Sequence, residues 1–237
     1  MGGKLIWCIG LYASASTWAF NVARLLHAVA DPPVRVKTHF FADKVDLAAL
    51  AEPVTHIVKT HEIDDVAGAE ALSERAARFV ITVRDPRDAV ASLMTYHGHD
   101  FERALAHVDK AMRLCVRHAA DPRAKVFYYE SKFFENEKMP EILAAHVGVT
   151  LGGGMGAKIF KALRREEVES FIATLPTRPG VLQDRKSGDR LDPQTHWHTH
   201  HAGRTGQIGR WQSGLTPEQA QAVQARLRDC FKFHAEA

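Results

Sequence analysis

Residues 5–26 read LIWCIGLYASASTWAFNVARLL, and this stretch decides the fold. It opens with an apolar run typical of a strand buried on both faces, which we predict over residues 5–9. A short loop of small residues follows at 11–15, and apolar side chains then recur at helical spacing from Ser16 onward. The free amides of a first helical turn and the helix dipole both point toward such a loop. The stretch predicts a P-loop-like strand–loop–helix that binds an anion, although an ordinary small-residue turn explains it equally well.

Strand and helix patterns alternate along the rest of the chain. Further strands are predicted at 34–38, 55–59, 78–83 and 125–129, and helices at 45–50, 67–76, 86–96, 101–119, 139–146, 157–174 and from 217 onward. This alternation predicts an α/β fold, with three α/β/α layers around a central parallel sheet, in a single domain over residues 1–237. Ligands bind such sheets at the carboxyl ends of the strands.

The composition narrows the class of protein. Apolar residues make up 46% of the 237 residues and charged residues 25%, as in ordinary soluble globular proteins. A net charge of +3 gives no general affinity for nucleic acid, and no apolar run approaches the ~18 residues of a membrane span. Cys8, Cys115 and Cys230 are far apart and lack CxxC spacing, which indicates reduced thiols. We therefore expect a cytoplasmic protein with no nucleic-acid partner and no membrane span.

The first loop is similar to a Walker A sequence but lacks its lysine. After Gly10, four residues lead to Ala15, Ser16 and Thr17, where an NTPase has Gly, Lys and Ser or Thr. Without that lysine, the main ligand for the β- and γ-phosphates is missing, and hydrolysis of ATP or GTP is disfavoured. The remaining donors are backbone amides and the hydroxyls of Ser14, Ser16 and Thr17. They suit a phosphate that needs no catalytic metal.

A second segment with anion-binding side chains follows the strand predicted at 78–83. Arg84 ends that strand, and Ser92 lies on the next helix, which Pro86 begins. An arginine fork and a serine hydroxyl can together hold a phosphate monoester. An ion pair on the surface between Arg84 and Asp85 or Asp88 is the alternative interpretation.

Five segments, in this order, carry a resemblance to a known family. They are GLYASASTW (10–18), KTH (59–61), RDPRDAVAS (84–92), YYE (128–130) and RTGQIGRW (204–211). Together the chain resembles the PAPS-dependent sulfotransferases, as a divergent bacterial-type member with the P-loop sulfotransferase fold. The resemblance implies transfer of a sulfuryl group from 3′-phosphoadenosine 5′-phosphosulfate (PAPS) to a hydroxyl or amine of a small-molecule acceptor, with PAP as the second product.

The resemblance also implies where the donor binds. Its 5′-phosphosulfate would lie in the first loop, its 3′-phosphate against Arg84 and Ser92, and its adenine against Trp18. Tyr129 would support the adenosine end. The implied donor-binding residues are Ser14, Ala15, Ser16, Thr17, Trp18, Arg84, Ser92, Tyr129, Arg204, Thr205 and Gly206. For Trp18, a place in the core of the first helix is the alternative.

His61 and Lys59 are the predicted catalytic residues. Sulfuryl transfer needs a base that works near neutral pH, and imidazole is the side chain suited to that. His61 is therefore predicted to be the general base. Lys59 would reach the bridging or sulfuryl oxygens, where negative charge develops as PAP leaves.

Departures from the family pattern leave other functions open. In the first loop, Ala13 stands where the family has Lys or Arg, Tyr12 where it has Pro, and Ala15 where it has Gly. In the C-terminal segment, Thr205 stands where the family has the Lys of its RKGxxG motif. Because the basic residue at the position of Ala13 normally touches the phosphosulfate, the chain can also be a non-catalytic protein that binds PAP or another adenosine bisphosphate. A nucleotide or small-molecule kinase is disfavoured by the missing lysine and by the lack of a clear Mg²⁺ carboxylate.

Residues 176–204 form a long segment without periodicity, which is usually functional in a compact domain. It holds four histidines, His196, His198, His200 and His201. Their spacing is compatible with zinc, but no Cys or carboxylate near them completes a recognised site. We therefore expect no metal. The acceptor and the oligomeric state cannot be read from the sequence.

Overall fold

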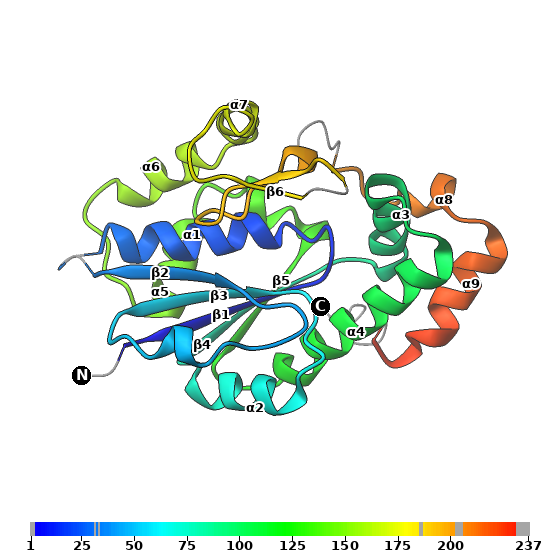
Figure 1. The fold of residues 1–237 in the computed structure, drawn as a ribbon, viewed down its shortest axis with the longest axis horizontal. Coiled ribbons are helices and arrows are strands. Elements are labelled where there is room, and N and C mark those ends of the chain that lie inside the picture. The colour runs from blue at the N-terminus through cyan, green and yellow to red at the C-terminus, as the bar shows by residue number, and fades with distance from the viewer. Residues whose placement is uncertain (1–2, 31, 33, 185–186, 202–205, 231–237) are drawn as a thin grey trace.

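The computed structural model describes residues 3–30, 32, 34–184, 187–201 and 206–230. Its centre is a five-stranded sheet in the order β2–β3–β1–β4–β5, in which every neighbouring pair is parallel (Figure 1). The strands are β1 (Leu5–Gly10), β2 (Val36–Phe40), β3 (Thr55–Thr60), β4 (Arg78–Val83) and β5 (Ala124–Tyr128). The predicted parallel α/β fold is confirmed.

Successive residues of the central strands enter two different hydrophobic cores. On β1, Trp7 and Ile9 lie in one core, whereas Ile6 and Cys8 lie in the other. All six residues of β1 are buried, because helices cover both faces of the sheet. This double burial explains why the strand reads as a continuous apolar run.

The helices form the two outer layers. One core includes side chains of α2 (Val66–Arg75), α3 (Pro86–His97), α4 (Phe101–Ala119) and α9 (Pro217–Arg226). The other includes side chains of α1 (Ser16–Ala28), α5 (Met139–Val147) and α6 (Met155–Ala162), which lie on the opposite side of the sheet in Figure 1. No helix in the described ranges is long and apolar enough to cross a membrane.

Several helix ends follow from their capping residues. Asp85 accepts a hydrogen bond from the amide of Arg87 and places Pro86 at the start of α3. Asp100 caps α4 in the same way, and the predicted helix at 101–119 is confirmed at both ends. Thr216 and Gln219 form a capping box at the start of α9.

Some predicted elements differ from the structure. The helix predicted at 157–174 is two helices, α6 and α7 (Arg165–Thr174). They separate at Leu163, whose carbonyl accepts a hydrogen bond from the indole of Trp18 (3.0 Å). The helix predicted at 45–50 is only a short 3₁₀ turn, η1 (Ala48–Leu50), and β2 begins two residues later than predicted.

The segment predicted as irregular has short elements in its described part. Strands β6 (Leu182–Gln183) and β7 (Arg190–Leu191) form an antiparallel hairpin, and a 3₁₀ turn, η4 (Thr199–His201), follows. The turn packs against α7. A short helix, α8 (Trp211–Gly214), then leads to α9.

Candidate functional site

The loop between β1 and α1 turns tightly over the end of the sheet. The amide of Leu11 donates to the carbonyl of Thr82 on β4 (2.8 Å). The buried hydroxyl of Ser14 bonds the carbonyl of Leu11 (2.6 Å) and the hydroxyl of Thr82 (2.7 Å). Gly10 is needed here, because a Cβ at this position would lie 2.2 Å from the Cβ of Ser16. The hydroxyl of Ser14 therefore holds the loop against the end of β4.

Two alanines in this loop have left-handed backbone conformations. Ala13 has φ of 56° and Ala15 has φ of 60°, which costs a residue with a Cβ roughly 1–2 kcal/mol. The carbonyl of Ala13 is held by a hydrogen bond from the guanidinium of Arg84 (2.9 Å). Strained backbone of this kind persists only where surrounding contacts fix it.

The start of α1 faces the loop. Its N-cap, Ala15, has no side chain that accepts from the first turn, and the first amides of a helix have no intrahelical partner. Ser16 and Thr17 begin the helix and are largely buried. This end of α1 has the donors that an anion needs.

Trp18 lies in the core beside α1. Its side chain is 7% exposed and meets the rings of Phe133 and Phe160 edge-on, at centroid distances of 5.9 and 6.5 Å. Its indole N–H donates to the carbonyl of Leu163. This placement agrees with the alternative of a core residue, and contact with adenine stays a prediction.

His61 lies at the carboxyl end of β3 and contacts the end of β1. Its Nδ1 is 2.6 Å from the carbonyl of Gly10, which can only accept, so Nδ1 donates and Nε2 holds the lone pair of the neutral ring. Nε2 is 3.2 Å from the Nζ of Lys59. The ring stacks on Tyr12 at a centroid distance of 4.5 Å. These contacts fix the tautomer that a base acting through Nε2 requires.

Burial lowers the pKa of both His61 and Lys59. Burial, and then the charge of Lys59, hold the pKa of His61 well below its usual range. The side chain of Lys59 is 2% exposed, and burial lowers its pKa to about 8. Near neutral pH, His61 is therefore neutral while Lys59 is largely protonated.

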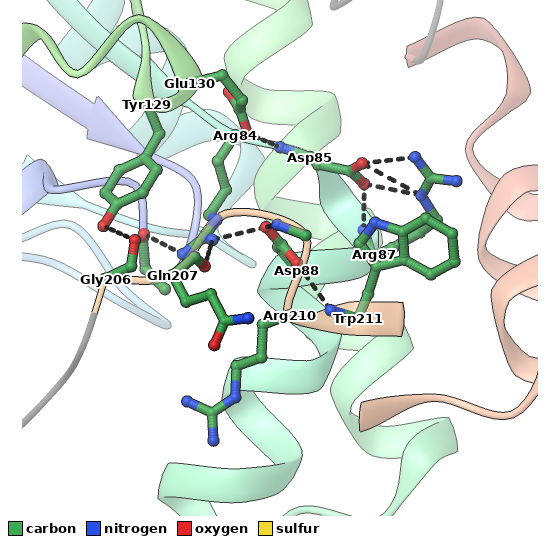
Figure 2. A network of polar contacts seen from close by, with 12 residues as sticks. Arg84, Asp85, Arg87, Asp88, Tyr129, Glu130, Gly206, Gln207, Arg210 and Trp211 are labelled. Atoms are coloured by element: carbon green, nitrogen blue, oxygen red, sulfur yellow. Dashed lines mark hydrogen bonds and ion pairs between the residues drawn. The ribbon is translucent and has the colours of Figure 1, made fainter. Parts of the chain in front are cut away.

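Arg84 is the centre of a second polar cluster (Figure 2). Its guanidinium donates to Asp88 (2.8 Å) and to the carbonyl of Gln207 (3.2 Å), in addition to Ala13, and lies 4.3 Å from the ring centroid of Tyr129. The ion pair with Asp88 that the sequence left open is present, but it is buried rather than on the surface. The Nε of Arg84 is buried without a partner among the described residues.

Asp88 connects the C-terminal segment at residues 206–211 to this cluster through hydrogen bonds. Its two carboxylate oxygens accept from the amides of Gly209 and Trp211, both at 2.9 Å. The sequence analysis missed this role, for which the only signal was an acidic residue one helical turn after Arg84. Ser92 is buried on α3 one turn beyond Asp88.

Tyr129 and Gly206 meet on the other side of Arg84. The hydroxyl of Tyr129 donates to the carbonyl of Gly206 (3.0 Å), as Figure 2 shows. Gly206 has φ of 66°, and a Cβ there would lie 2.7 Å from the Tyr129 oxygen, so a larger residue would strain the backbone and displace the Tyr129 hydroxyl. Arg204 and Thr205 lie outside the described residues.

A further polar group missed by the sequence analysis adjoins His61. Glu62 accepts a hydrogen bond from the hydroxyl of Tyr12 (3.1 Å) and lies 2.5 Å from Nδ1 of His107. Because Tyr12 stacks on His61, the hydrogen bond from Tyr12 to Glu62 helps to hold Tyr12 against the face of that ring.

The expectation that no carboxylate accompanies the histidines at 196–201 is wrong. Asp189 lies 2.7 Å from Nδ1 of His198 and 3.1 Å from Nδ1 of His200. His196 is instead buried against the ring of Phe20. An antiparallel bridge between Leu191 and His198 brings Asp189 close to the histidines, and no periodic pattern in the sequence indicated this pairing.

Comparison with known proteins identifies the fold. No protein-family model matches the chain, and no curated protein matches it in sequence. Mouse sulfotransferase SULT7A1, solved with PAP, is 15% identical, with a TM-score of 0.62 over 97% of this chain and 85% of that chain. Retinol dehydratase with retinol and PAP is 13% identical, with a TM-score of 0.59 over 98% of this chain and 82% of that chain. Retinol dehydratase with androsterone and PAP is 14% identical, with a TM-score of 0.61 over the same shares. The chain therefore has the sulfotransferase fold that its sequence resemblance predicted.

Proposed function

We propose that this protein transfers a sulfuryl group from PAPS to a hydroxyl or amine of a small-molecule acceptor and releases PAP. The observation that carries the proposal is the hydrogen bond between His61 and the carbonyl of Gly10, because it ties the candidate base to the anion loop. PAP in the solved neighbours of the same fold supports the choice of donor.

The donor would bind across both polar clusters. Its phosphosulfate would be held by the amides that open α1 and by the hydroxyls of Ser16 and Thr17. Its 3′-phosphate would take the Nε donor of Arg84, a buried group with no partner among the described residues. Asp88 holds the rest of that guanidinium in place. Arg204, Thr205 and Gly206 would complete this end of the site, as the resemblance implies.

In the reaction, the acceptor oxygen or nitrogen attacks the sulfur while the bond from sulfur to the bridging phosphate oxygen breaks. PAP leaves with the electron pair, and Nε2 of His61 takes the proton of the acceptor. Lys59 donates a hydrogen bond to this same Nε2 (3.2 Å). Its ammonium would turn to the bridging oxygen when PAPS binds, which frees the base and neutralises charge on the leaving phosphate.

A second candidate function is a protein that binds PAP without catalysis. Ala13 favours it, because the basic residue that the resemblance places there is absent. Lys59 supports the catalytic alternative, since it supplies a cation next to the anion loop.

The test combines binding and turnover. The protein is titrated with PAP, PAPS and ATP, and PAP release is measured with a panel of hydroxyl and amine acceptors. We expect the unchanged protein to bind PAP and to catalyse turnover. His61→Asn should keep the dissociation constant for PAP within about twofold and lower the rate of PAP release roughly 100-fold or more. His146→Gln, which changes a histidine bonded to the carbonyl of Phe79, is the control. PAP binding without turnover of any acceptor would favour the second function, and failure to bind PAP would contradict both.

A further inference from the structure

The proposed sulfuryl transfer does not use Asp189, His198 or His200, which come together beside β7 and η4. His198 and His200 both direct Nδ1 to the carboxylate of Asp189, one to each oxygen, at 2.7 and 3.1 Å. The two imidazole rings are stacked, 5.4 Å apart and 20° from parallel. They therefore present the same edge to a single carboxylate.

We propose that Asp189, His198 and His200 bind one divalent transition-metal cation, with zinc as the reference ion. Two imidazole nitrogens and one carboxylate oxygen form a ligand set that zinc accepts, and a catalytic-type site with three protein ligands leaves the fourth position to water or another ligand. The inference does not depend on the proposed sulfuryl transfer.

The distances suit such an ion. The three ligand atoms lie within 4.8 Å of one another. In a tetrahedral site with bonds of 2.0–2.2 Å, ligand atoms are about 3.3 Å apart. The existing separations of 2.7 and 3.1 Å, each to a different oxygen of Asp189, are about 0.6 and 0.2 Å shorter, so rotations of the side chains open the site.

Neighbouring groups already hold these ligands in place. The hydroxyl of Thr199 donates to Asp189 (2.6 Å) and accepts from the amide of Arg190 (3.1 Å). The amide of His198 donates to Nδ1 of His201 (3.1 Å). Such outer contacts orient ligands and reduce the ordering that metal binding requires.

A bound ion would stabilise the segment after α7, by linking Asp189 to the histidines around η4. Asp189 precedes β7, whereas His198 and His200 belong to the part around η4, which packs against α7. The ring of His200 also meets that of His97 at the end of α3, at a centroid distance of 4.8 Å. A bound ion joins these parts of the segment through coordination bonds.

The test uses the full-length protein after removal of metal with a chelator. Zinc chloride is added in a calorimetric titration, and cobalt is added in parallel because tetrahedral Co²⁺ has strong visible absorption. We expect one ion per chain and a zinc-dependent rise in melting temperature. Asp189→Asn, His198→Ala and His200→Ala should each weaken binding roughly 100-fold or more, and Thr199→Val about tenfold.

His146→Gln is the control, because this histidine is not a proposed ligand and bonds the carbonyl of Phe79 instead. It should bind zinc within about threefold of the unchanged protein, a limit set well below the loss expected for a supporting residue. The metal-free variants are compared by circular dichroism and melting temperature, so that loss of the fold is recognised separately. Absence of saturable binding at one ion per chain, or equal loss in His146→Gln and His200→Ala, would overturn the proposal.

Discussion

At the scale of single residues, His61 and Lys59 form a pair whose protonation is set by burial. The charged form of each is penalised by desolvation, and the charge of Lys59 further lowers the pKa of His61. The carbonyl of Gly10 keeps the lone pair of His61 on Nε2. The result is a neutral base beside a cation whose pKa is near 8.

This pair predicts the pH dependence of PAP release. A base works above its own pKa, so activity should stay constant from neutral pH down through the usual range of histidine, because the pKa of His61 is lowered. The lysine works only when protonated, so kcat/KM should fall as pH rises through about 8. Lys59→Arg should shift this alkaline limb upward by more than one pH unit, since arginine stays charged.

The measurement is a profile of kcat/KM for PAPS between pH 5 and 10, with PAPS as the varied substrate, so that it reports Lys59 before the donor binds. His146→Gln serves as the control, because it changes a histidine that bonds the carbonyl of Phe79 near the start of β4 and has no contact with this pair. An acid limb at the usual pKa of histidine, or an alkaline limb that Lys59→Arg leaves in place, would contradict the assignment.

At the scale of elements, the strands were easier to predict than the connections. β4 and α4 match their predicted bounds because a β-branched run and a long amphipathic pattern are local signals. The break between α6 and α7 is not local. It depends on the carbonyl of Leu163 bonding to Trp18, which lies 145 residues away in the sequence. β6 and β7 are too short to have a periodicity.

The contact between α3 and the C-terminal segment depends on Asp88. Asp88→Ala should lower the free energy of unfolding by about 3–5 kcal/mol, because it leaves the buried guanidinium of Arg84 without its anion and two amides without an acceptor. Asp64→Ala is the matched control, since its ion pair with Lys110 is exposed and should be worth less than 1 kcal/mol.

Urea unfolding followed by circular dichroism measures both variants. A cost for Asp88→Ala no larger than that for Asp64→Ala would mean that the buried pair does not hold the segment. Arg84→Met in the same background tests the cause. With the unpaired cation removed, the double variant should recover part of the loss.

At the scale of the whole molecule, parallel topology gathers the site at one edge of the sheet. The predicted residues Lys59, His61 and Arg84 could be found because each lies at the end of a strand or directly after it. Asp88 and Glu62 were missed because their partners come from distant parts of the chain. Asp189 was missed because its partners lie nine or more residues further on, in a segment without periodicity. Spacing along a sequence does not show such pairs.

The same topology joins the two predicted phosphate sites, since Arg84 holds both the loop at Ala13 and the segment at Gln207. A ligand with both phosphates should therefore stabilise the molecule more than one with the 5′-phosphate alone. At 100 times its dissociation constant, PAP should add about 2.7 kcal/mol to the free energy of unfolding. For a chain of this size, that corresponds to a rise in melting temperature of roughly 5–11 °C.

AMP lacks the 3′-phosphate. At the same concentration as PAP it should give less than half of this rise in melting temperature, and Arg84→Met should remove the difference between the two ligands. Thermal unfolding of both proteins with each ligand measures these shifts, and equal shifts with PAP and AMP in the unchanged protein would refute a 3′-phosphate site at Arg84.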